Sequence, residues 1–191
     1  MAKIVVFAGS ARKDSFNKKL AKIAHQKLVD VGADAEFIDL ADYPMPIYDG
    51  DLEAGEGLPE NAKKLKAVFN AADGFLIVSP EYNSSFPPLL KNVIDWCSRP
   101  EGDGDFMLKV FSGKVAAIAG ASPGGFGGMR ALVPLRMLLG NIAMTVIPNQ
   151  LAVSAVHEKF GEDGSISDDG TNMSLDFLVQ ALKDTTEKLR G

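Results

Sequence analysis

The chain has 191 residues, of which 46% are hydrophobic and 24% charged, and its formal net charge is −5. This length predicts one domain spanning residues 1–191, with enough chain to bury a sizeable core. The negative charge argues against a nucleic-acid partner, because basic surfaces supply most of the affinity for phosphate backbones. No apolar run reaches about 18 residues, so no membrane insertion is expected.

Neither disulfides nor metal sites are expected in this chain. Its only cysteine is Cys97, which we expect in the core rather than in a redox role. Asp49, Asp51 and Glu53 imitate the start of a calcium loop, but Ala54 stands where such a loop needs glycine. Because the first ten residues, "MAKIVVFAGS", lack the pattern of a signal peptide, we expect a cytoplasmic protein.

Short β-rich runs alternate with helical patterns along the chain. The expected strands cover residues 3–8, 35–40, 74–79, 114–120 and 143–148, and apolar residues at helical spacing lie within 20–31, 65–72 and 175–189. Gly32 and Gly74 are expected to end helices. The alternation predicts an α/β fold, a doubly wound five-stranded parallel sheet of order 2-1-3-4-5 with helices on both faces.

Ligands of such sheets bind beyond the carboxyl ends of the strands, where the strand order reverses. In this order the reversal lies between the first and third strands. The turns after the first, third and fourth strands read "GSARKDSFN" (9–17), "SPEYNSSFP" (79–87) and "ASPGGFGG" (121–128). All three have unusual residue types, so we expect the functional site there.

The first turn has the residues of an anion site. Ser10, Ser15 and Asn17 cluster with Arg12 at the expected start of a helix, where a simple N-cap needs only one such side chain. Backbone N–H groups at a helix start favour an anion, and an arginine adds a charge-assisted contact. The P-loop lysine with its adjacent Ser/Thr is missing, so the pattern favours a phosphate monoester over a triphosphate.

The other two turns suit a flat ring. Pro80 makes its turn rigid and would fix the backbone groups of Glu81, Tyr82 and Asn83 at one edge, although a rigid turn with an exposed tyrosine is an equal alternative. Residues 122–128 include four glycines, which either let the backbone approach a planar ligand or simply make a flexible turn. One phosphate together with a planar heterocycle is the shape of flavin mononucleotide (FMN).

The segments "GSARKDSFN", "SPEYNSSFPPLLKNVIDW" and "GKVAAIAGASPGGFGGMRA" resemble those of the flavodoxin-like NAD(P)H-dependent FMN reductases, a group that includes quinone, chromate and azo-dye reductases. The likeness runs from the first strand to the fifth, and P-E-Y-N followed by L-K-N-x-x-D-W is its most specific part. It implies a flavodoxin-like fold and three sets of FMN contacts. The phosphate would be held by Ser10, Arg12, Ser15 and Asn17, the ring edge by Pro80, Glu81, Tyr82 and Asn83, and the far end of the ring by Ser122, Gly124 and Gly125.

The resemblance also implies an activity. Hydride would pass from NADPH or NADH to FMN and then to a quinone-like, flavin, azo or metal-oxyanion acceptor, in ping-pong order. No side chain is expected to act as an acid or base, and Tyr82 would shape the substrate side. The alternatives are a flavodoxin-type electron carrier without nicotinamide activity and a flavin-free binding protein for a ligand such as a sugar phosphate.

The helical segment 130–142 departs from the family pattern and is unusually apolar. Pro134 within it is expected at the first turn of the helix or at a kink, so no role is assigned to Arg130. Leu132, Val133 and Met137 contribute to more than one apolar face. This surplus, together with the habit of the resembling family, predicts a homodimer or a homotetramer.

Overall fold

The computed structural model describes residues 1–102, 104–161 and 164–190. Its sheet consists of β1 (Lys3–Ala8), β2 (Asp34–Ile38), β3 (Gly74–Val78), β4 (Val115–Ala121) and β5 (Thr145–Val153). All pairs are parallel and the order is β2-β1-β3-β4-β5, which confirms the predicted topology. The carboxyl ends of β1, β3 and β4 are therefore neighbours.

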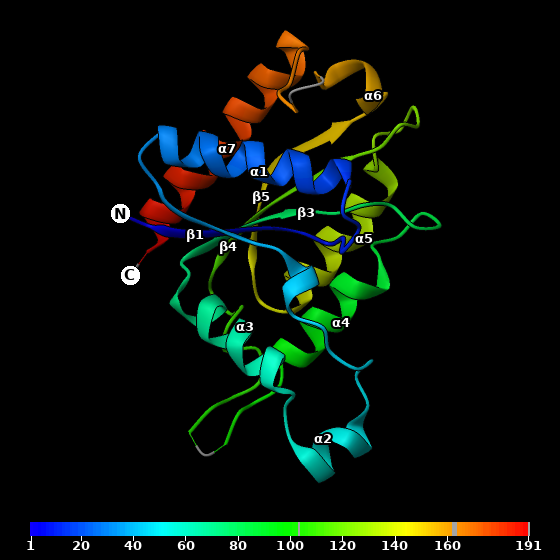
Figure 1. Cartoon of the computed structure of the whole chain (residues 1–191). Coiled ribbons are helices and arrows are strands. Elements are labelled where there is room, and N and C mark those ends of the chain that lie inside the picture. Colours follow the sequence, from blue (N-terminus) through cyan, green and yellow to red (C-terminus); the bar gives the residue numbers. More distant parts are fainter. Residues whose placement is uncertain (103, 162–163, 191) are drawn as a thin grey trace.

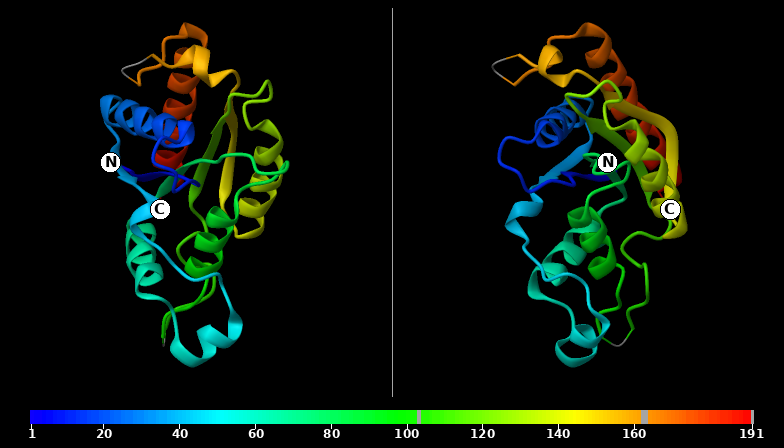
Figure 2. Two further views of the ribbon diagram at one scale, coloured as in Figure 1. Left: turned by 45° about the vertical axis from the view of Figure 1, so that its right-hand side comes forward. Right: turned by 90° about the vertical axis from the view of Figure 1, so that its right-hand side faces the viewer.

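Helices cover both faces of the sheet (Figures 1 and 2). On one face lie α1 (Phe16–Asp30) and α7 (Asp169–Leu189), and on the other lie α3 (Glu60–Ala71), α4 (Pro88–Cys97) and α5 (Met129–Asn141). Successive residues of β1 enter opposite cores: Ile4 packs with α1 and α7, whereas Val5 packs with α3, α4 and α5. Because both faces are covered, the central strands are apolar at nearly every position.

The boundaries of several elements differ from the sequence-based expectation. The second strand ends at Ile38 because the 3-10 helix η1 (Leu40–Asp42) follows, and β5 continues to Val153. Gly32 follows α1 with a φ of +82°, as a helix stop should. The expectation for Gly74 is wrong: it begins β3, where an added Cβ would lie 2.8 Å from Oγ1 of Thr186 on α7.

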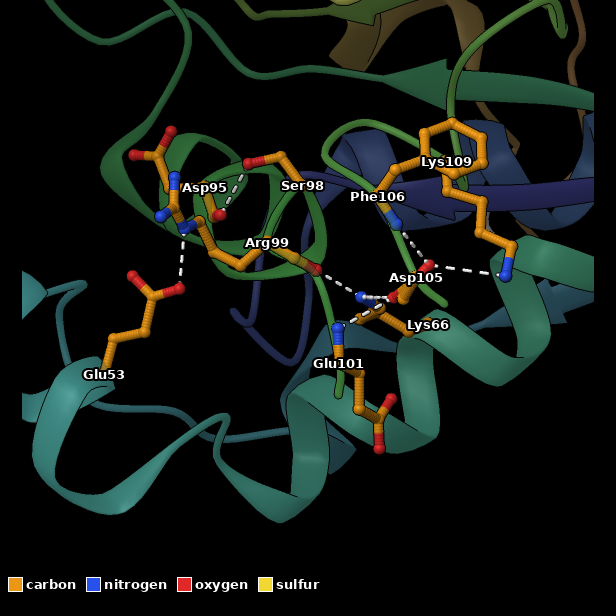
Figure 3. Close-up of polar contacts among 9 residues, drawn as sticks. All are labelled: Glu53, Lys66, Asp95, Ser98, Arg99, Glu101, Asp105, Phe106 and Lys109. Carbon is orange, nitrogen blue, oxygen red and sulfur yellow. Dashed lines mark hydrogen bonds and ion pairs between the residues drawn. The ribbon is translucent and has the colours of Figure 1, made fainter. Parts of the chain in front are cut away.

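Between η1 and α3 the chain makes an excursion that contains α2 (Gly50–Glu56), at the lower end of Figure 1. The Asp49 carboxylate caps this helix by accepting from the N–H of Asp51 at 2.8 Å. Polar contacts tie the excursion to the loop after α4 (Figure 3). Arg99 donates to Glu53 at 2.7 Å, and Lys66 on α3 donates to the carbonyl of Arg99 and to Asp105.

Lys66 and Asp105 form the buried part of this network, with side chains that are 6% and 11% exposed. Burial by itself would raise the pKa of Asp105. Hydrogen bonds from Lys66 and from the N–H groups of Glu101 and Phe106 outweigh this effect and hold the pKa well below its usual range. The carboxylate therefore stays ionised and joins the loop to α3.

Two further expectations concern single residues in the helices. Cys97 is buried at the end of α4, as predicted, and burial raises the pKa of its thiol to about 12. Pro134 lies inside α5 and past its first turn, so the first-turn placement is wrong.

Among the described residues, no helix is long and apolar enough to cross a membrane.

Candidate functional site

The three loops predicted from the sequence meet at the carboxyl edge of β1, β3 and β4 and line two adjoining cavities. A cavity of about 170 Å³ is lined by eight of the predicted residues: Ser10, Arg12, Ser15, Asn17, Pro80, Glu81, Tyr82 and Ser122. A second cavity of about 430 Å³ shares Glu81 and Ser122 and adds Asn83, Gly124 and Gly125. Together they fall within the roughly 300–1,000 Å³ that is typical of cofactor pockets.

Sequence reasoning missed several other lining residues. They are Phe16, Ala121 and Pro123 in the smaller cavity, and Ser84, Phe126, Gly127, Gly128 and Arg130 in the larger one. Most of them adjoin a predicted residue in the same loop, so a wider reading of the three motifs would have included them. Arg130 carried a separate signal, because it is an arginine at the start of a helix beside the glycine loop.

The first loop leaves donors free at the start of α1. Ser15 is the N-cap and its Oγ accepts from the N–H of Lys18 at 3.4 Å. Within the described part of the chain, the N–H groups of Phe16 and Asn17 have no acceptor and the guanidinium of exposed Arg12 has no partner. Unpaired N–H groups and a free cation at a helix start are suited to an anion.

The Asn17 side chain is used by the protein itself. Its Nδ2 donates to the carbonyl of Ala121 at 3.0 Å, and its Oδ1 accepts from the N–H of Ala121 at 2.9 Å. The residue is 5% exposed, so both bonds are shielded from water. In this arrangement Asn17 joins α1 to the end of β4, and among the described residues its backbone N–H has no acceptor.

A buried lysine supports the first loop from behind. Lys18 is 7% exposed, and its ammonium pairs at 2.7 Å with Asp39, which directly follows β2. The same ammonium donates to the carbonyl of Ala11 at 3.3 Å, within the loop that contains Arg12. This support was not predicted, since the sequence alone does not show that Lys18 faces inward.

The second loop is a tight turn with two residues in the left-handed region. Asn83 and Ser84 have φ values of +51° and +64°, and Tyr82 and Ser85 exchange backbone hydrogen bonds of 2.9 and 3.1 Å around them. Such values are uncommon for residues with a side chain and persist where the surroundings hold them. Tyr82 is 52% exposed and lines the smaller cavity.

The glycine loop, residues 124–128, packs directly against the backbone at the end of β5. An added Cβ at Gly127 would lie 2.6 Å from the N of Ser154, and Gly127 and Gly128 both have positive φ. The N–H of Ser122 is bonded to Val153, and that of Gly124 to the Ser122 hydroxyl. Gly125 has open space around it, which leaves room for the backbone to approach a ligand.

An ion pair connects the second and third loops. Glu81 accepts from Nε of Arg130 at 2.6 Å and from its Nη2 at 2.5 Å, while the backbone N–H of Arg130 donates to the other carboxylate oxygen at 3.1 Å. The Glu81 side chain is 10% exposed. The guanidinium also lies 5.0 Å from the ring centre of Phe126.

Comparison with known proteins identifies the family. The model of the NADPH-dependent FMN reductase family matches residues 2–158. The chain is 37% identical over 175 residues to a 2-hydroxy-1,4-benzoquinone reductase of a Burkholderia species, covering 91% of this chain and 90% of that protein. It is 35% identical over 192 residues to an NAD(P)H-dependent FMN reductase of Pseudomonas aeruginosa, covering 99% and 97%.

The solved structures agree. The chain superposes on FerB, a flavoenzyme NAD(P)H:(acceptor) oxidoreductase of Paracoccus denitrificans, with a TM-score of 0.83 and 34% identity, covering 98% of both chains. An archaeal flavodoxin shares the fold alone, at a TM-score of 0.61 and 11% identity. The chain therefore belongs to the NADPH-dependent FMN reductase family.

Proposed function

We propose that the three-loop site binds FMN, with its phosphate at the start of α1 and its ring along the second and third loops. As a member of its family, the chain is an NAD(P)H-dependent reductase of the FMN and quinone reductase class. When bound, the flavin supplies the chemistry, by taking a hydride from NAD(P)H and passing electrons to a quinone-type acceptor. The residues of the chain bind and orient it.

One observation carries the phosphate assignment. The guanidinium of Arg12 and the N–H groups of Phe16 and Asn17, which have no partner in the described part of the chain, border the same cavity as the buried hydroxyls of Ser10 and Ser15. A doubly charged phosphate monoester would satisfy all these donors at once. The open backbone at Gly125 and the exposed Tyr82 then leave space for a ring.

The protein provides donors where negative charge grows on a reduced ring. The candidates in the third loop are the hydroxyl of Ser122 and the N–H of Gly125, because the N–H groups of Ser122 and Gly124 already have partners. Fixed donors of this kind stabilise developing charge without having to reorganise. We assign no acid or base to any side chain of the site.

FMN titration of the apoprotein tests the phosphate site. Arg12→Ala removes a charge-assisted contact and should weaken FMN binding by about 1.5–3 kcal/mol, which is roughly ten- to 150-fold. Lys13→Ala is the matched control, because it removes the neighbouring positive charge without lining either cavity. Equal affinities for the two variants would refute the role of Arg12, and a wild-type protein that ignores FMN would refute the cofactor.

A steady-state assay tests the activity. NADPH and NADH are each offered with and without a panel of quinones, flavins, azo dyes and metal oxyanions. We expect rapid oxidation of the nicotinamide only with an acceptor, with parallel double-reciprocal lines as ping-pong order requires. A yellow protein that oxidises neither nicotinamide would instead be an electron carrier.

We also propose a cytoplasmic homodimer, which could pair further into a tetramer. Along α5 the residues Met129, Val133 and Met137 are 50%, 68% and 65% exposed and share one face at a spacing of four residues. An apolar stripe beside the site is a natural place for a second copy. The lone buried thiol of Cys97 suits a reducing compartment.

A further inference from the structure

The helix α5 begins without a cap of its own. Its N-cap residue is Gly128, which has a φ of +87° and no side chain to accept from the first turn. Neither glycine before the helix can be replaced cheaply, because Gly128 has a left-handed backbone and an added Cβ at Gly127 would enter the backbone of Val153 and Ser154. The conformation of the glycine loop therefore leaves the helix to be capped from elsewhere.

Glu81 supplies the missing cap from the neighbouring loop. One of its carboxylate oxygens accepts from the N–H of Arg130, the second residue of α5, which is the bond that an N-cap side chain would normally make. Its other oxygen accepts from the Arg130 guanidinium at 2.5 and 2.6 Å. A carboxylate at a helix start also interacts favourably with the helix dipole.

This pair connects the two loops along which we place the flavin ring. Glu81 lines both cavities, and Arg130 lines the larger one. Glu81 directly precedes the turn in which Asn83 and Ser84 hold left-handed φ values. A turn of that kind has to be held by its surroundings. Pro80 and the Glu81 carboxylate, which both precede the turn, provide this anchoring.

We propose that Glu81 and Arg130 form a positioning pair that fixes the spacing of the second and third loops and balances the charge next to the ring. The proposal rests on the proposed FMN function. Glu81 acts here through its side chain, in addition to the backbone contact expected from the sequence. The pair is neutral only while both partners are present, so each single substitution leaves a charge of known sign beside the flavin.

The sign of the charge that each substitution leaves can be tested, because a purely structural role would not predict potential shifts of opposite sign. Reduction places negative charge on the ring, and a nearby positive charge favours the reduced form. Glu81→Gln keeps an oxygen for the cap and leaves Arg130 positive, so the midpoint potential of the bound flavin should rise. Arg130→Met leaves the half-buried Glu81 carboxylate without its countercharge, so the potential should fall.

The experiment is a redox titration of the FMN-loaded variants, with FMN affinity measured on the apoproteins. We expect potential shifts of opposite sign and, for Arg130→Met, FMN binding weakened by about tenfold. The control is Glu187→Gln, which breaks an exposed pair with Lys183 near the end of α7 and should change neither quantity. Shifts of the same sign, or unchanged potentials and affinities, would overturn the proposal.

Hydrogen exchange of the apoprotein gives a readout that needs no flavin. In Glu81→Ala the amides of Tyr82 and Ser85, which close the turn, should exchange faster than in the unchanged protein. Unchanged exchange at both amides would refute the anchoring role. If the wild-type protein binds no FMN, the proposed function fails, whereas normal FMN binding with indifferent variants refutes only the positioning pair.

Discussion

Replacing Asn17 by alanine tests whether this residue binds phosphate or joins two elements. The substitution removes two buried hydrogen bonds to Ala121, of 3.0 and 2.9 Å. At about 1 kcal/mol each, their loss should lower the free energy of unfolding by about 2 kcal/mol, and by about 4 kcal/mol where no water replaces the side chain. In a chain of this size, 2 kcal/mol corresponds to a drop of roughly 4–8 °C in Tm.

The assay compares urea unfolding of the apoprotein with FMN titration. Asn17→Ala should be less stable than the unchanged protein, but its FMN affinity should fall by less than tenfold. The reason is that the backbone N–H of residue 17 stays in place. Gln26→Ala is the matched control on the same helix, since the amide of Gln26 donates to exposed Asp30. This substitution should change stability by less than about 0.5 kcal/mol. Unchanged unfolding of Asn17→Ala with a large loss of FMN affinity would show that the amide binds the phosphate instead.

Three further predictions concern other parts of the molecule. Burial raises the pKa of Cys97 to about 12, so a thiol reagent at pH 8 should label the native protein only at the rate of unfolding, and fast labelling would contradict the buried position. Asp105→Ala leaves the ammonium of Lys66 buried without its carboxylate and should lower stability at pH 7 by about 3 kcal/mol. Because the pKa of Asp105 is lower folded than unfolded, its stabilisation is complete above about pH 4 and is lost below it, so urea curves of the two proteins should converge in acid. Val133→Glu puts a charge on the exposed stripe of α5 and should shift the sedimentation coefficient toward monomer, whereas an unchanged coefficient would remove this face from the interface.

The sheet could be predicted because each of its central strands is recognisable from its own short stretch of sequence. The segments that became β1, β3 and β4 are short and apolar at successive positions, which is the pattern of a strand covered on both sides. The end of β5 was misjudged, since the pairing of β4 with β5 is irregular between Ala116 and Ile118 and the strand continues past Pro148. Gly74 was misread because a side chain at this position would collide with Thr186, which lies more than a hundred positions further along the chain.

The sequence was enough to predict most of the residues that line the two cavities, but not which of their polar groups are bonded within the protein. Ser10, Arg12, Ser15 and Asn17 look equivalent in the sequence, and all four do line one cavity. Only the structure shows that the amide of Asn17 is bonded to Ala121, whereas the guanidinium of Arg12 has no partner among the described residues. The partner of that amide is Ala121, which is 104 positions away, so no local sequence pattern predicts this contact.

The distinction follows from how buried polar atoms are satisfied. A polar group withdrawn from water has to find a partner, and at a cofactor site that partner is either the ligand or the protein. Asn17, Lys18 and Glu81 have their partners within the chain, and each connects one loop of the site to another element. Among the described residues, the guanidinium of exposed Arg12 and the N–H groups of Phe16 and Asn17 have no protein partner, so they remain available to an anion. A residue of the first kind should therefore be recognised by stability lost in the apoprotein, and one of the second kind by affinity lost at unchanged stability.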